Sequence, residues 1–247
     1  MCIRDSSWLY DNHGLYLRDQ TVRDTQIAMN RPSSHGLYVH LYMDGLYWGL
    51  YNLVERLDEK FAVAYFGGQD EDYDVIGGKT LGIVGVDNGD AVAWNTMMDI
   101  SEAGVADPAQ YAAIQQYLDV PNLIDYMLVH IYAGTYDDWP DRNWTAIRKR
   151  EAGASFKFMS WDNGMSLRYV NWDNSTIGPD FPNSPAYLYW RLQDNAEFRL
   201  LFADHMQRHF FNGGVFYVDP ANPQWDPAHP ERNVPCLLYT SSATADS

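Results

Sequence analysis

The sequence predicts an α+β domain in which the strands lie in hairpins and the helices are segregated from them. Strand-like patterns with turn residues between them occur twice, at residues 37–54 and 144–161. Helical patterns fill most of the remaining chain and do not alternate regularly with single strands. A doubly wound parallel sheet requires such alternation, so we expect a hairpin-containing sheet with a helical C-terminal part.

Composition supports a folded domain and excludes some functions. The chain has 247 residues, of which 46% are apolar and 15% aromatic, enough to build a packed core. It has no run of 18 apolar residues, so we expect no membrane span. The net charge of −16 argues against binding to nucleic acid or anionic membranes. A phosphate-bearing ligand would therefore need bound cations or a local group of Arg and Lys.

The two ends of the chain differ from its body. Residues 1–6 and 236–247 resemble translated remnants of the sequencing adapters found at the ends of metagenomic gene fragments, so we expect both segments to lie outside the fold. They contain both cysteines, which leaves the body without a disulfide framework or a thiolate zinc site. We place one domain at 7–214 and an extended tail at 215–235, and we expect the natural domain to begin further upstream.

The first half of the body should contain a helix at 16–29 and then a hairpin. Strands at 37–43 and 46–54 flank Asp44-Gly45, a dipeptide that favours tight turns. Both faces of this hairpin are apolar, so we expect it inside a sheet that is covered on both sides. A helix should follow Asp58 and stop at Gly67-Gly68, and a short strand at 72–76 should end at Gly77.

The second half should be mainly helical around one further hairpin. Helical spacing occurs at 91–100, 108–118 and 122–132, with the strongest apolar stripe in the last. Strands at 144–150 and 155–161 form the second hairpin. An ordered loop at 168–184 should then lead to helices at 187–192 and 195–211.

The acidic stretch from Asp137 to Asp162 carries the residues that suggest chemistry. Asp138 and Asn143 are five residues apart, which is the Asp-to-Asn spacing of a protein-kinase catalytic loop. Asn143 precedes one strand of the second hairpin and Asp162 follows its partner, so antiparallel pairing should bring both to one end. Asp138 could then receive a proton from an acceptor hydroxyl, while Asn143 and Asp162 hold Mg²⁺. One of Asp137 and Asp141 should cap a turn. On spacing alone, an acidic surface loop remains the alternative.

Four motifs occur in an order that resembles the spore-coat CotH family of atypical kinases. They are Gly-Leu-Tyr-Trp-Gly-Leu-Tyr-Asn-Leu-Val-Glu-Arg, Asp-Tyr-Asp-Val-Ile, Asp-Asp-Trp-Pro…Asn-Trp and Phe-Met-Ser-Trp-Asp, within residues 17–214. The resemblance implies a remote protein-kinase-like fold that uses Mg²⁺ and ATP to phosphorylate Ser or Thr of a protein. It assigns Asp138 to the catalytic-loop Asp, Asn143 to the metal-binding Asn and Asp162 to the Asp of a DFG-type motif.

The phosphate-binding residues are less clearly indicated. Lys79 follows the Asp-Tyr-Asp-Val-Ile strand near the place of the phosphate-binding Lys. Glu55 or Arg56 could be its partner, or either could simply begin a helix. Arg18 and Arg23 could reach phosphates, although a solvated helix face is favoured for both. Members of the family commonly carry a second acid two residues after the metal-binding Asp, whereas this chain has Gly164.

Other functions remain open alternatives. The domain could be a degenerate CotH-like binding or structural module of a larger secreted or cell-surface protein. A metal-dependent hydrolase is less favoured, because no histidine ligand accompanies the acids; His35, His40 and His130 share no ligand spacing. Ser33-Ser34-His35 is too local for a catalytic triad. The acidic, cysteine-free body and the resemblance favour an extracellular, cell-surface or spore-coat location.

Overall fold

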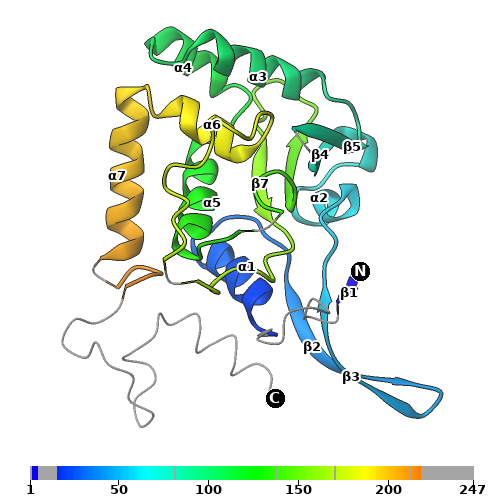
Figure 1. Cartoon of the computed structure of the whole chain (residues 1–247). Coiled ribbons are helices and arrows are strands. Elements are labelled where there is room, and N and C mark those ends of the chain that lie inside the picture. Colours follow the sequence, from blue (N-terminus) through cyan, green and yellow to red (C-terminus); the bar gives the residue numbers. More distant parts are fainter. Residues whose placement is uncertain are drawn as a thin grey trace.

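The computed structural model describes residues 2–4, 16–80, 82–136, 138–169, 171–211 and 213–217. The predicted α+β class is confirmed, because this part of the chain contains seven α-helices and two antiparallel sheets (Figure 1). Most of the predicted tail lies outside the described residues. Residues 2–4, which the sequence assigned to an end segment, form a strand here.

Helices were predicted at seven places, and a helix is present at each. Their bounds are α1 (Arg18–Ala28), α2 (Glu59–Phe66), α3 (Val92–Ala103), α4 (Pro108–Ile114), α5 (Val120–Tyr132), α6 (Pro185–Leu192) and α7 (Ala196–Phe210), with a short 3-10 helix at Asp70–Asp72. The strands are β1 (Cys2–Arg4), β2 (Gly36–Met43), β3 (Leu46–Val54), β4 (Tyr73–Thr80), β5 (Ile83–Asn88), β6 (Trp144–Lys149) and β7 (Lys157–Ser160).

A four-stranded sheet in the order β5-β4-β6-β7 forms the centre of the domain. Successive side chains of a strand point to opposite faces, so each strand contributes to two cores. On one face, buried Val75, Ile147 and Met159 pack with Phe61 of α2. On the other, Ile76, Ala146 and Phe158 join the large helical core. This sheet is therefore the one that is covered on both sides.

The first hairpin, β2–β3, is not the buried hairpin that its apolar faces predicted. Its turn is as expected, since Asp44 and Gly45 both have positive φ (50° and 79°). However, it extends away from the body (Figure 1), and Tyr42 and Leu46 near its tip are 63% and 69% exposed. Only the base of β3 is buried, at Asn52 and Val54. The β2–β3 hairpin therefore has apolar side chains on both faces, but other elements do not cover both faces.

Strand β4 continues through the two glycines that were expected to end it. The reason is the close approach of β4 to the acidic loop. A Cβ atom on Gly78 would lie 2.5 Å from the backbone oxygen of Asp141 and 2.6 Å from the indole nitrogen of Trp144. Glycine here serves contact between the strand and the loop, and so does not mark a strand end.

Helix α5 is the central helix and leads into the acidic loop. It packs against α1, α6, α7 and β7 (Figure 1), and nearly all its side chains are buried. Its first turn is capped by Asp119, whose carboxylate accepts a hydrogen bond from the backbone N–H of Asn122 at 3.0 Å. No helix in the described ranges is both long and apolar enough to cross a membrane.

Candidate active site

The acidic loop runs from the end of α5 to the start of β6. Asp138 and Arg142 form an ion pair, with Oδ1 and Nη2 2.7 Å apart, and both side chains are partly exposed. The backbone N–H of Arg142 also donates to the carbonyl of Asp138 at 2.6 Å, which closes the loop into a turn. Asp141 Oδ1 accepts from the backbone N–H of Gly82 at 3.1 Å, which connects the acidic loop to the turn between β4 and β5. Asp137 lies outside the described residues.

Asn143 and Asp162 meet at one end of the second hairpin, as the predicted topology requires. Strands β6 and β7 pair antiparallel, with Trp144 opposite Ser160. The side-chain amide of Asn143 donates from Nδ2 to the backbone oxygen of Asp162 at 3.4 Å. Both residues have positive φ (62° and 56°), a conformation that Asn and Asp tolerate better than most residues and that recurs at functional sites.

The first turn of α1 holds the segment that follows Asp162. Asp19 accepts a hydrogen bond at Oδ1 from the backbone N–H of Asn163 at 2.7 Å. Through Oδ2 the same carboxylate pairs with Nε of Arg23 at 3.2 Å. The Nη1 atom of Arg18 lies 3.5 Å from the carbonyl oxygen of Gly164. Helix α1 thus contributes to the geometry of the site, which the sequence did not predict.

Arg18 and Arg23 do not lie on a solvated helix face, so that expectation is wrong. Both are buried, and Arg23 is fully inaccessible to solvent. Its guanidinium donates to the carbonyl of Ser34 (3.1 Å) and the side-chain oxygens of Gln20 (3.0 Å) and Asn52 (2.7 Å), besides Asp19. Arg23 therefore connects α1 to β3, and its donors are used within the protein.

Asn163, directly after Asp162, has a buried side chain without a hydrogen-bond partner. Neither its Oδ1 nor its Nδ2 atom has one among the described residues, and the residue is fully buried. A buried amide that lacks partners costs roughly 1–3 kcal/mol, and such a group therefore requires an explanation.

A buried polar cluster around His130 packs against the acidic loop. His130 on α5 stacks on Trp139 of the loop, with ring centroids 4.5 Å apart. Its Nδ1 lies 3.0 Å from the hydroxyl of Thr135, and its Nε2 lies 3.2 Å from the hydroxyl of Ser160. Burial lowers the pKa of His130 from 6.5 to about 3, so the ring is neutral at physiological pH. His130 is thus a hydrogen-bonded core residue, the role that the sequence favoured.

Lys79 lies near the end of β4, next to the glycine that contacts the acidic loop. Its Nζ pairs with Oδ1 of Asp87 on β5 at 3.1 Å, and both side chains are about half exposed. Its aliphatic chain passes over Gly85, where a Cβ atom would lie 1.9 Å from Cε. The partner expected from the other sheet, Glu55 or Arg56, is not its partner in this structure.

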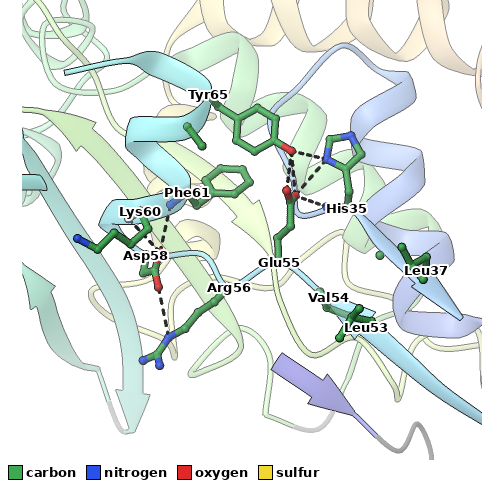
Figure 2. A pocket seen from close by; sticks show the side chains of 12 residues that line it. His35, Leu37, Leu53, Val54, Glu55, Arg56, Asp58, Lys60, Phe61 and Tyr65 are labelled. Atoms are coloured by element: carbon green, nitrogen blue, oxygen red, sulfur yellow. Dashed lines mark hydrogen bonds and ion pairs between the residues drawn. The ribbon is translucent and has the colours of Figure 1, made fainter. Parts of the chain in front are cut away.

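Glu55 and Arg56 follow β3 and line a pocket of about 510 Å³ between the β2–β3 base and α2 (Figure 2). Glu55 accepts from the backbone N–H of His35 (2.8 Å) and the hydroxyl of Tyr65 (2.8 Å), and it also contacts the His35 ring (3.1 Å). Burial would raise the pKa of Glu55, but these hydrogen bonds outweigh it and lower the pKa. Arg56 is exposed, with Nε 3.8 Å from Oδ2 of Asp58. The predicted cofactor roles of both residues stay predictions.

Comparison with known proteins gives a match to a protein family. No curated protein matches the chain. The family described as CotH kinase protein matches residues 6–212, which is most of the chain. The chain belongs to the CotH family. The matched region extends from before α1 to the end of α7, so it includes the acidic loop, the second hairpin and the α1 contacts.

The residues of this CotH domain suit the ATP and metal that the family suggests. Asp162 and Asn143 would hold Mg²⁺, since a carboxylate and an amide oxygen are hard ligands of the kind that it prefers. Nδ2 of Asn143 donates to a backbone oxygen, which leaves its Oδ1 as the atom to face a metal. Asn163, whose buried amide has no partner among the described residues, directly follows Asp162 in the chain.

Proposed function

We propose that this CotH domain transfers the γ-phosphoryl group of ATP to a Ser or Thr hydroxyl of a protein. One observation carries the proposal: Asn143 and Asp162 meet at one end of the β6–β7 hairpin, with Asp138 in the loop that leads there. This is the set of oxygen ligands and acid that phosphoryl transfer requires. The family match supports the same reaction class.

In this reaction Asp138 takes the proton of the acceptor hydroxyl. A bond forms between the hydroxyl oxygen and the γ-phosphorus, and the bond from that phosphorus to the β–γ bridging oxygen breaks, which releases ADP. Arg142 orients the Asp138 carboxylate through the ion pair at 2.7 Å. Asn143 and Asp162 would hold the metal ion, which when bound would supply positive charge beside the transferred phosphate. Lys79 is the proposed cation over the phosphates and would have to leave Asp87.

Replacing Asp162 with asparagine tests this proposal directly. Asparagine tolerates the positive φ of this position, so the change removes charge and preserves the backbone. We expect Mg²⁺-dependent incorporation of labelled γ-phosphate into a generic protein acceptor, or into the chain itself, to fall at least 100-fold. Asp173→Asn, at an exposed site, is the matched control and should keep full activity. Equal incorporation by the wild type and Asp162→Asn would contradict the proposal.

Gly164 gives a second prediction, in the direction of gained activity. A Cβ atom on Gly164 would meet no atom within 4 Å, so a side chain fits there. Gly164→Asp restores the second acid of the family pattern and should lower the Mg²⁺ concentration for half-maximal activity about tenfold, because a carboxylate adds a hard ligand. Gly164→Ala, which adds no ligand, is the control. An unchanged Mg²⁺ dependence in Gly164→Asp would show that this position does not contribute to the metal site.

A second candidate, a catalytically degenerate CotH binding module, is favoured by two observations. Gly164 lacks the second acid, and Lys79 is paired with Asp87. Such a module would give no phosphate incorporation by the wild type under any Mg²⁺ concentration.

For either function we propose an extracellular, cell-surface or spore-coat location. Fractionation of the expressing cells, with an antibody to the domain, would test it.

A further inference from the structure

A second group of ligand-type side chains lies between α5 and α7 and shares no residue with the acidic loop. Asp125 comes from α5, and His205 and His209 come from α7. All three are buried, and Asp125 is fully so. The two histidines are four residues apart on one helix and therefore lie on the same face.

Three ligand atoms converge in this group. Oδ1 of Asp125 lies 2.6 Å from Nδ1 of His205 and 3.0 Å from Nε2 of His209. All three atoms lie within 4.8 Å of one another. A tetrahedral zinc ion with bonds of about 2.0–2.2 Å places its ligand atoms roughly 3.3 Å apart. Small side-chain shifts would thus open the group enough to surround an ion.

The other carboxylate oxygen of Asp125 is held by an arginine. Nε of Arg31, just after α1, lies 2.5 Å from Oδ2. This contact fixes the orientation of the carboxylate and directs Oδ1 at the two imidazoles. Hydrogen-bonded partners of this kind orient the ligands of protein metal sites.

We propose that Asp125, His205 and His209 bind a divalent transition-metal ion, with zinc as the best fit, that joins α7 to α5. Two imidazole nitrogens and one carboxylate oxygen suit zinc better than magnesium, which prefers oxygen ligands. The group holds three protein ligands among the described residues, so water takes the fourth position.

This site is independent of the proposed kinase reaction. Its ligands are nitrogen-rich and buried between helices, whereas Asn143 and Asp162 offer oxygen ligands beside the acidic loop. The ion would hold the last helix of the CotH domain against the central one. Its expected effect is therefore on stability, and metal binding and unfolding measure it without any activity assay.

The test uses the untagged full chain, treated with a chelator and dialysed free of it. Equilibrium dialysis against zinc chloride followed by elemental analysis should give one bound ion per chain. Zinc at 100 times its Kd should raise the Tm by about 5–10 °C. Cobalt(II) in place of zinc should give the intense visible absorption of a tetrahedral site, a readout that needs no variant.

Single substitutions identify the ligands. Asp125→Asn, His205→Gln and His209→Gln should each lower zinc affinity at least tenfold, while His40→Gln, at an exposed position of β2, should not change it. If the wild type binds no stoichiometric zinc, the group is a hydrogen-bonded cluster only and the proposal is wrong. The same conclusion follows if zinc binds equally to the wild type and to all three variants.

Discussion

Asp138→Asn is expected to lower kcat by about 10²–10⁴-fold, the usual contribution of general acid–base catalysis. The amide keeps the shape of the carboxylate, and its oxygen can still accept from Arg142, so the loop should hold its turn. Nucleotide affinity should stay within a few-fold of the wild type, because Asp138 takes the proton of the acceptor and does not bind phosphate. Steady-state kinetics with an ATP titration separate kcat from KM.

Two controls in the same loop distinguish a chemical role of Asp138 from a structural one. Asp141→Asn keeps an oxygen for the N–H of Gly82 and should retain activity. Arg142→Ala removes the ion pair but leaves the carboxylate, and exposed pairs contribute little to stability. If Asp141→Asn lost as much kcat as Asp138→Asn, the loss would reflect the conformation of the loop and not proton transfer by Asp138.

The sequence predicted element types well because local periodicity was strong. All seven helices and both hairpins are present in the structure. The errors arise where contacts between distant segments decide. Strand β4 passes through Gly77 and Gly78 because it packs against Asp141 and Trp144, some sixty residues later. The exposure of the β2–β3 tip has the same origin, since apolar faces do not reveal what covers them.

The part of the candidate site that lies at the end of the second hairpin could be predicted from the sequence. Antiparallel pairing of β6 with β7 was enough to bring Asn143 and Asp162 together. The contact between α1 and the segment after Asp162 could not be predicted from the sequence, because Asp19 and Asn163 are separated by 144 residues. Lys79 could not be assigned a partner for a similar reason, since its contact with Asp87 depends on β5, a strand that the sequence did not indicate.

The buried face of α7 shows why the second ligand group was missed. Met206 continues the apolar spacing of α7 but is 39% exposed, whereas His205 and His209 are buried. The histidines that were weighed as ligands from the sequence, His35, His40 and His130, make other contacts. The spacing of two histidines four residues apart on a helix was a signal that could have found this group.

The stability of the domain is expected to fall as the pH falls below 6.5, because of His130. Burial lowers its pKa from 6.5 to about 3 in the folded state. Between these values the unfolded chain binds a proton that the folded chain does not, so protonation favours unfolding. Within this window the free energy of unfolding should fall by up to about 1.4 kcal/mol for each pH unit of acidification. Below pH 3 His130 is protonated in both states, so its effect on stability stops growing. Urea unfolding at a series of pH values measures it.

His130→Gln isolates this contribution from the other carboxylates and histidines that titrate in the same range. Glutamine can hydrogen-bond to Thr135 and Ser160 but does not titrate, so the variant should be less stable at neutral pH and lose less stability on acidification. The difference in free energy of unfolding between the wild type and His130→Gln should become smaller from pH 6.5 towards pH 3. Parallel profiles would mean that His130 is protonated in the folded state, and its stacking on Trp139 would then hold the acidic loop through a charged ring. Because Thr135 and Trp139 connect His130 to the loop that carries Asp138, loss of stability in acid should begin at the candidate active site.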